Sequence, residues 1–497
     1  MSEPQVMPLQ KNETYSLKID DLTHDGAGVA KMGGFPIFIR GALIGEEIRC
    51  RIIQVKSKYA IGKLEAVLQP SKDRVLPPCA IYGKCGGCQL QHLDYGAQLQ
   101  WKQHLVQRHM IHIAKSDVRV YPPIGANENP RETPLDLAMN NQPSGENGIQ
   151  RAKPFEKKKP LSAEPKEGEW RYRHKAILPF GVSPNGTPIL GFYAPHSHRV
   201  VPVSDCLIQA GTFAEIVSIT LSFVRDAGLC VYDEAIHKGL LRALVIRRSA
   251  TTGKLVVGLS LNAKTCPALS VWVESLQALP EIQGVFLCQN FGRNNVPLSG
   301  AILPLWGDLV LRETLGEISF ALGPLSFFQV NPAQAAYIVA YLKALPLGSS
   351  PIIWDLYAGV GTMGLVFARS ASVVCVEMVP EAAQLCRLNA AENGLDNVHV
   401  IEGSLESSLD QLASLPLPDM VILDPPRQGC HESVLDFLQN REVPLIVYIS
   451  CDPATFARDS LRLSAAYRCT DVQPVDMFPM TRHVEVIGVF QRITLCL

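Results

Sequence analysis

The chain has 497 residues, which is too long for one ordinary hydrophobic core, so we expect two or three domains. Apolar residues make up 47% and charged residues 19%, a composition that excludes a largely disordered protein. No apolar run approaches the roughly 20 residues of a membrane helix, and the polar start shows no secretory signal. We therefore expect a cytoplasmic protein with no membrane partner. The net charge of −1 leaves nucleic-acid binding to local basic surfaces.

Residues 8–69 contain short strand-like runs separated by glycine turns, which predicts a small all-β barrel. The run GEEIRCRI alternates apolar and charged positions around Ile48 and Cys50. The stretch HDGAGVAKMGGFPIFIRGALIGE resembles the TRAM module, a small RNA-binding barrel related to the OB fold. The resemblance implies an N-terminal RNA-binding domain, and a purely structural barrel is the alternative.

Residues 127–169 interrupt this pattern, because they are rich in Pro, Glu, Lys, Asn and Gly and have almost no periodic apolar face. Such a stretch cannot bury enough surface to offset its ordering entropy, so we predict a disordered insertion. It separates residues 70–126, which hold three closely spaced cysteines, from residues 170–325. In the latter, VVGLSLNA and IQGVFLCQN predict strands and FAEIVSITLSFVRDAG predicts a helix. We expect a central α+β domain that binds RNA.

Three basic stretches are candidates for phosphate contacts, although charge runs are more often solvated surface. They are Arg151 to Lys159; Arg171, Arg173 and Lys175; and Arg242, Arg247 and Arg248.

Residues 326–497 alternate between strand-like and helix-like segments, which predicts a Rossmann-like α/β domain with a parallel sheet. The helix PEAAQLCRLNAAENG ends at a glycine. The predicted strands are PIIWDLYAG, SVVCVEM, NVHVIEG, DMVILDPP and PLIVYIS. In such sheets ligands bind at the carboxyl ends of the strands.

The first of these strands ends in a glycine-rich turn, GVGTMG, where the backbone can approach a ligand closely. The next strand ends in Glu377, which could accept hydrogen bonds from a ribose diol, and the fourth ends in Asp424. A phosphate site would favour lysine, whereas a cationic sulfonium tolerates carboxylates. S-adenosylmethionine therefore fits this pattern best, and a purely structural turn is the alternative.

Cys451 follows the apolar strand 445–450 and precedes a turn made by Asp and Pro, so its thiolate could act as a nucleophile. Carbon 5 of uracil needs such help, because it accepts a methyl group only after thiolate addition at carbon 6. A base must then remove the proton at carbon 5. Glu485, inside RHVEVIGVF, would have a raised pKa if buried and would suit that step. Solvent exposure in an edge strand is the alternative.

Six separated segments together resemble the RNA 5-methyluridine methyltransferase family, and the resemblance covers nearly the whole chain outside the insertion. They are FFQVNP, DLYAGVGTMG, the strand end at Glu377, DPPRQGC, YISCDPATFARD and HVEVIGVF. The resemblance implies that Cys451 is the nucleophile and Glu485 the base. It also implies that S-adenosylmethionine is bound by Gln329, Tyr357, Glu377 and Asp424. Thr362 stands where members often have asparagine, so no contact is carried over to it.

The run CAIYGKCGGCQLQH brings Cys79, Cys85 and Cys88 together, and three thiolates that bind a metal need a fourth ligand. The spacing leaves two alternatives, a zinc site completed by His92 or a site completed by the distant Cys206. The resemblance favours Cys206 and a 4Fe–4S cluster held by four cysteines. Because members acting on transfer RNA generally lack the TRAM module and the cluster, it also implies 23S ribosomal RNA as the substrate.

Two functions from other classes are alternatives to this interpretation. An adenine amino-methyltransferase would carry an Asn-Pro-Pro-Tyr type motif and no nucleophile, whereas this chain has DPPR followed by Cys451. A non-catalytic RNA-binding protein would have lost Cys451 and Glu485, and both are present. We expect no obligate protein partner.

Overall fold

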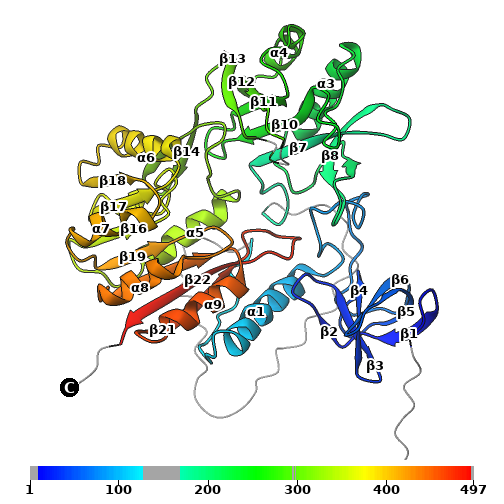
Figure 1. Cartoon of the computed structure of the whole chain (residues 1–497), viewed down its shortest axis with the longest axis horizontal. Coiled ribbons are helices and arrows are strands. Elements are labelled where there is room, and N and C mark those ends of the chain that lie inside the picture. Colours follow the sequence, from blue (N-terminus) through cyan, green and yellow to red (C-terminus); the bar gives the residue numbers. More distant parts are fainter. Residues whose placement is uncertain (1–8, 127–167, 294–295, 297, 494–497) are drawn as a thin grey trace, which may run out of the picture.

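A computed structural model describes residues 9–126, 168–293, 296 and 298–493. Within them, three large sheets mark an N-terminal, a central and a C-terminal unit (Figure 1). The predicted disordered insertion and the basic stretch Arg151 to Lys159 lie outside the described residues, except for Gly168 and Glu169. In the described ranges no helix is long and apolar enough to cross a membrane.

The N-terminal unit is one six-stranded sheet with the order β1-β5-β6-β4-β3-β2. Its strands are β1 (Thr14–Lys18), β2 (Asp21–Leu22), β3 (Gly28–Met32), β4 (Phe35–Arg40), β5 (Glu47–Val55) and β6 (Ala60–Gln69). Ile48, Cys50 and Ile52 of β5 are fully buried, as the alternation predicted. The sheet is curled but is not the closed barrel that we predicted, because β1 and β2 form opposite edges and no ladder joins them in the described chain.

Residues 19 and 20 connect β1 to β2, and their hydrogen bonds show why no ladder joins these two strands. The amide of Ile19 still bonds the carbonyl of Glu46, before β5 (2.9 Å), whereas the amide of Asp20 bonds that of Val29, in β3 (2.8 Å). One continuous segment thus supplies both edges, and its hydrogen bonds are divided between two different neighbours.

Helix α1 (Tyr95–His112) lies between the N-terminal sheet and the C-terminal unit (Figure 1). It begins at Asp94, whose side chain accepts a hydrogen bond from the helix's first turn. Trp101 packs with Leu22 of the N-terminal sheet, whereas Val106 belongs to the core of the C-terminal unit. The helix was not predicted, and it joins the two units that carry the recognised motifs.

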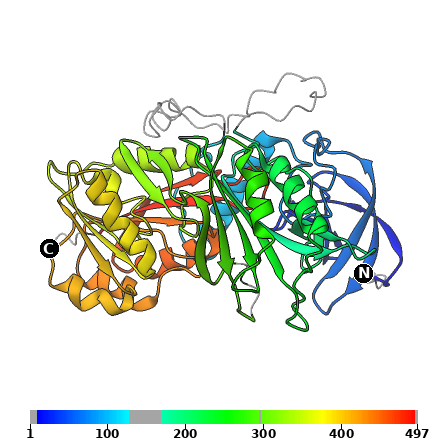
Figure 2. The same ribbon diagram turned by 90° about the horizontal axis from the view of Figure 1, so that it is seen from above.

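The central unit confirms the predicted α+β arrangement, with a seven-stranded sheet of order β13-β12-β11-β10-β7-β8-β9. Figure 2 shows the N-terminal and C-terminal units at opposite ends of the molecule, with α3 and α4 between them. The elements are β7 (Lys175–Val182), β8 (Pro188–Tyr193), β9 (Val200–Pro202), α3 (Phe213–Asp226), β10 (Leu241–Arg248), β11 (Leu255–Leu261), α4 (Leu269–Gln277), β12 (Ile282–Gln289) and β13 (Ala301–Gly307).

Two arginines of the third basic stretch are internal, not on a surface open to RNA. Arg242 is buried and its Nη1 donates to the carbonyl of Asn290 (3.0 Å). Arg247 is buried and its Nη1 donates to the carbonyls of Gly323 (2.8 Å) and Ser326 (2.6 Å). Their charge satisfies backbone carbonyls, so this stretch is not a phosphate-binding patch.

The C-terminal unit has a seven-stranded sheet of order β18-β17-β16-β19-β20-β22-β21. The first five strands are parallel, as predicted, and β22 then pairs antiparallel with β20 and β21. A hairpin of β14 (Leu311–Leu315) and β15 (Ile318–Leu322) precedes this sheet. The elements that follow are α5 (Pro332–Lys343), β16 (Ile352–Asp355), η1 (Leu365–Phe367), β17 (Ser372–Glu377), α6 (Pro380–Glu392), β18 (Val398–Glu402), η2 (Glu406–Ser408), α7 (Leu409–Ala413), β19 (Met420–Leu423), α8 (Glu432–Asn440), β20 (Leu445–Ser450), α9 (Pro453–Leu463), β21 (Tyr467–Val475) and β22 (Glu485–Arg492).

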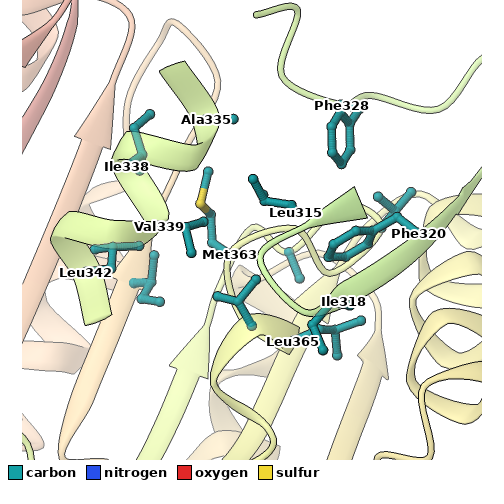
Figure 3. Close-up of a cluster of buried hydrophobic side chains, with 14 of the residues drawn as sticks. Leu315, Ile318, Phe320, Phe328, Ala335, Ile338, Val339, Leu342, Met363 and Leu365 are labelled. Carbon is teal, nitrogen blue, oxygen red and sulfur yellow. The ribbon is translucent and has the colours of Figure 1, made fainter. Parts of the chain in front are cut away.

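One hydrophobic core supports the glycine-rich turn after β16. Figure 3 shows Met363 and Leu365 from this turn next to Leu315 and Phe320 of the β14–β15 hairpin and Ile338 of α5. All five side chains are at most 3% exposed. The turn leads into the short 3-10 helix η1, and the packing of its apolar side chains fixes its position.

Candidate active site

Cys451 lies directly after β20, at the carboxyl edge of the sheet, as predicted. The next residue, Asp452, caps α9, because its Oδ1 accepts hydrogen bonds from the amides of Ala454 (2.9 Å) and Thr455 (3.0 Å). The cap ends the strand and starts the helix within two residues. The thiol is therefore only partly buried, at the mouth of the sheet edge.

Glu485 begins β22 and lies beside the end of β20. Ser450 pairs with Val486, so the antiparallel register continues to place position 451 opposite position 485. On the other side, Glu485 pairs with Val475 of β21. It is 3% exposed, so the alternative of a solvent-exposed glutamate in an edge strand is wrong.

Gln329 and Asp424 meet at the same edge although 95 residues separate them. The Nε2 of Gln329 donates to Oδ2 of Asp424 over 3.3 Å, and Gln329 is buried. The chain turns after Gln329 because Asn331 caps α5, with Pro332 in the helix's first turn. This cap holds the FFQVNP segment over the end of β19.

The carboxylates of Glu377 and Asp355 hold the glycine-rich turn by accepting hydrogen bonds from backbone amides. Oε2 of Glu377 accepts from the amide of Gly359 (2.7 Å), and Oε1 accepts from the amide of Val379 (2.7 Å). Oδ2 of Asp355 accepts from the amide of Gly364 (2.7 Å), while its Oδ1 is buried without a hydrogen-bond partner. The two carboxylates thus fix the backbone of the turn through its amides.

The carboxyl groups at this edge share a desolvated environment, which disfavours their negative charge. Burial, together with nearby Asp424, raises the pKa of Asp355 to about 7. Burial raises the pKa of Asp424 to about 7 as well. Burial and then Asp424 raise the pKa of Glu485 well above its ordinary value, and Arg427 opposes this. A bound cation would relieve the repulsion among these groups.

Arg427 is the cation that faces Cys451. Burial and then Glu485 raise the pKa of Cys451 to about 11, whereas the charge of Arg427 and its hydrogen bond to the thiol lower it. Arg427 comes from the turn after β19, so the strand that carries Asp424 also brings a positive charge to the sulfur. The thiol is thus mostly protonated at neutral pH and needs this guanidinium to ionise.

Tyr357, expected to contact the cofactor, has its phenol on the side of the turn that faces α8. Burial raises the pKa of Tyr357 well above its ordinary value, and a hydrogen bond with Cys430 raises it further. The ring packs beside the cluster of Cys430, Val434 and Tyr448. Its hydroxyl therefore helps to hold the turn against Cys430.

Cys79, Cys85, Cys88 and Cys206 line a single pocket of about 340 Å³ between the N-terminal segment and the central sheet. Burial and then the neighbouring thiols Cys206, Cys85 and Cys79 raise the pKa of Cys88 to about 12, so the four groups are close enough to repel as thiolates. Cys206, the distant cysteine of the prediction, thus lies beside the three local ones.

The alternative fourth ligand, His92, does not line this pocket. Its Nδ1 is hydrogen-bonded to the hydroxyl of Tyr82 (2.6 Å), and burial lowers the pKa of His92 to about 4. Within the described ranges, no group of three or more His, Cys, Asp or Glu side chains is arranged to hold a metal ion. The four cysteines thus surround a pocket and do not converge on one point, so a site for a single metal ion is not supported.

Comparison with known proteins decides the family. Residues 317–493 match the family model of tRNA (Uracil-5-)-methyltransferases, and residues 8–64 match the TRAM domain. A protein of Halalkalibacterium halodurans named as an uncharacterized RNA methyltransferase is 36% identical over 499 residues, 99% of each chain. A protein of Clostridium tetani with the same description is 36% identical over 488 residues, 97% of each chain. The chain belongs to the RNA uracil-5-methyltransferase family.

The fold of this family member also has a solved counterpart. The crystal structure of Pyrococcus abyssi tRNA (uracil-54, C5)-methyltransferase in complex with S-adenosyl-L-homocysteine superposes with a TM-score of 0.72. The match covers 96% of this chain and all of the other at 24% identity. The likeness is one of fold and extends over nearly the whole chain.

Sequence reasoning missed two residues at the site of this methyltransferase. Asp355 ends β16 and precedes the DLYAG motif's apolar residues, which makes it look like a structural strand end. Arg427 was quoted inside DPPR but given no role. Position in a motif was the available signal for both. The effect of Asp424 on Asp355 and that of Arg427 on Cys451 arise only where the strand ends come together at the folded sheet edge.

Proposed function

We propose that this protein methylates carbon 5 of a uridine in 23S ribosomal RNA, with S-adenosylmethionine as the methyl donor. The observation that supports this best is the pairing of β20 with β22, which puts Cys451 beside the buried carboxyl group of Glu485. A thiol and a carboxyl group with a raised pKa are the two groups that uracil methylation at carbon 5 requires.

In the proposed reaction the thiolate of Cys451 adds to carbon 6 of the uracil, and the displaced electron pair makes carbon 5 an enolate-type nucleophile. Bound S-adenosylmethionine supplies the methyl group as a sulfonium. Glu485 then takes the proton from carbon 5. The electrons of that bond form the new carbon 5–carbon 6 double bond, and the carbon–sulfur pair returns to Cys451 as the thiolate leaves.

The residues proposed to hold the methyl donor are Gln329, Tyr357, Glu377 and Asp424. Their support is the set of desolvated carboxyl groups, since burial raises the pKa of Asp424 to about 7 and a sulfonium cation would stabilise its ionised form. Asp355 belongs with them, because its Oδ1 is buried without a partner. Tyr357 would contact the methyl donor through its backbone and its ring, because its hydroxyl is hydrogen-bonded with Cys430.

For the cysteine pocket we propose a 4Fe–4S cluster held by Cys79, Cys85, Cys88 and Cys206. The support is chemical: four thiols line one pocket that is wider than a single ion would need. Such a group would cross-link the N-terminal segment to the central sheet and would supply no electrons to methyl transfer.

Iron and acid-labile sulfide measured after anaerobic purification would test this proposal. We expect both in near fourfold stoichiometry, and we expect Cys206→Ser to lose them while the exposed Cys230→Ser keeps them. Stoichiometric zinc without sulfide would contradict the proposal.

Mapping of 5-methyluridine in a deletion strain is the experiment that tests the function. We expect one or more positions of 23S ribosomal RNA to lose the modification and to regain it with the wild-type gene but not with Cys451→Ala. Loss confined to transfer RNA would assign the second candidate substrate, which the name of the Pyrococcus abyssi relative supports. Loss of N6-methyladenosine, or no change, would contradict uracil methylation.

A further inference from the structure

The loop of residues 476–484 joins β21 to β22 and returns the chain to Glu485, and helix α1 holds it from outside the C-terminal unit (Figure 1). Nζ of Lys102 bonds Oδ1 of Asp476, and both side chains are 0% exposed. The hydroxyl of Tyr95, two turns earlier on α1, donates to Oδ2 of the same carboxylate (2.9 Å). More than 370 residues of sequence separate the partners.

The middle of the loop is held in the same way. The amide of Met480 donates to Oε1 of Gln98 (3.1 Å), and its carbonyl accepts from the amide of Leu90 (3.0 Å). Lys102 also donates to the carbonyl of Phe478 (3.1 Å). Met480 has a φ of 65°, a left-handed conformation that a residue with a side chain adopts only when its surroundings enforce it.

These contacts act on the residue that faces the reaction. Asp476 directly follows Val475, and Val475 is the ladder partner of Glu485. Fixing the backbone at Asp476 therefore fixes the backbone opposite Glu485, because partners in an antiparallel ladder move together. The position of Cys451 does not depend on this loop, because the turn that carries Cys451 is fixed by Asp452, which caps α9.

We propose that Lys102 is a positioning residue that acts through Asp476 to hold Glu485 at the proton on carbon 5. This inference rests on the function proposed above. It assigns the buried ion pair to one step, the elimination that releases the product. Buried ion pairs contribute little net stability compared with apolar side chains of similar volume, but they can fix one arrangement among several.

A double exchange, Lys102→Met with Asp476→Leu, separates positioning from stability. The apolar pair fills the same space without leaving a lone buried charge, so we expect a cooperative thermal transition close to that of the wild type. In single-turnover reactions with radioactive methyl donor, we expect the methyl group to enter RNA at a near-normal rate. Release should slow by about 10- to 100-fold, as for a misplaced reacting group, and a methylated RNA–protein adduct should persist on denaturing gels.

Arg108→Met is the matched control, because it removes an exposed ion pair with Asp21 from the same helix. We expect it to release product at the wild-type rate. If the double exchange perturbs folding, Tyr95→Phe, which removes one hydrogen bond to Asp476, should show the same adduct to a smaller degree. A folded double exchange or Tyr95→Phe that releases product normally would overturn the positioning role. A wild type that makes no 5-methyluridine would overturn the proposed function instead.

Discussion

At the scale of single residues, burial at the sheet edge disfavours the negative charge of Glu485. Its side chain is nearly inaccessible, and burial together with Asp424 raises its pKa well above the ordinary range. A carboxylate with a raised pKa is a stronger base once it is ionised, so in the proposed reaction Glu485 takes the proton from carbon 5 and later loses it to solvent as the product leaves.

Replacing Glu485 by Gln should trap the reaction after methyl transfer. The amide keeps the shape and the burial of the side chain but cannot take the proton from carbon 5, so the carbon–sulfur bond to Cys451 stays intact. We expect a covalent, methylated adduct that survives denaturing electrophoresis. Free methylated RNA formed at the wild-type rate would show that another group removes the proton.

The pH dependence of the first step should report the ionisation of Cys451. Its pKa lies at about 11, so the thiolate fraction and the rate of adduct formation should rise as pH rises from 6 to 9. Arg427→Gln removes the charge that lowers this pKa, so the thiolate fraction and the rate should fall by the same factor at every pH from 6 to 9, because the whole range lies below the pKa. Single-turnover rates across this range measure the loss.

Wild-type rates of adduct formation in Arg427→Gln at every pH from 6 to 9 would mean that the guanidinium does not assist the thiol. Arg387→Gln is the control, since its exposed pair with Glu402 lies at the far edge of the sheet and should leave the profile as it is.

At the scale of elements, the turn after β16 is the part whose shape depends most on glycine. Gly361 has a φ of 92°, and a Cβ there would lie 2.6 Å from Leu365 and 2.9 Å from the sulfur of Cys386. Both neighbours are fully buried. The turn cannot accept a side chain without moving away from the core that supports it.

Gly361→Ala should therefore weaken cofactor binding by at least about tenfold, corresponding to roughly 1.4 kcal/mol. Calorimetric titration with S-adenosylhomocysteine measures this. Gly348→Ala is the matched control, because a Cβ at that position meets nothing within 4 Å and its φ is not left-handed. Equal affinities in the two variants would argue against a role of this turn in binding.

Sequence patterns predicted the elements whose apolar residues follow a simple pattern and missed the elements in which polar residues interrupt it. The strands of the parallel sheet are continuous apolar runs bounded by turn residues, so β16, β17, β19 and β20 could be placed within a few residues. Helix α1 was missed because Gln98 and Lys102 are among its buried positions, which interrupts the apolar face. The antiparallel direction of β22 could not be read from its run, since a buried strand looks the same in either direction.

The candidate site divides in the same way. Cys451, Glu377 and Asp424 stand at strand ends next to recognisable motifs and were predicted. The neighbours that tune them, such as Arg427 and Asp355, depend on which strand ends are adjacent in the sheet. That order, β17-β16-β19-β20, is a property of the folded chain.

At the scale of the whole molecule, the N-terminal sheet is tied to the rest through one desolvated ion pair. Glu46 is 0% exposed and accepts from Arg74 (Nη2 to Oε2, 2.8 Å) as well as from the amides of Leu43 and Ser71. Arg74 lies on the strip that leads from this sheet toward α1, where it bridges to Leu93. Despite burial, these partners lower the pKa of Glu46.

Arg74→Met should destabilise the protein by about 2–3 kcal/mol at pH 7, because it leaves the carboxylate buried with only amide partners. The folded pKa of Glu46 is depressed, so the contribution is present above the unfolded value of about 4.3 and is lost as pH falls through the folded pKa. Urea denaturation at pH 7 and pH 3.5 should therefore show a difference from wild type that is smaller at the lower pH. Equal differences at both pH values would contradict this.

The contact between Gln98 and Met480 joins parts of the chain 382 residues apart, and it has a consequence for any shortened enzyme. A fragment starting at residue 311 would keep the β14–β15 hairpin, the whole parallel sheet, the thiol of Cys451 and the turn for the methyl donor. It would lack the helix that clamps its last hairpin. Such a fragment would be expected to react with RNA once and stay attached, a stoichiometric label where the intact chain is a catalyst.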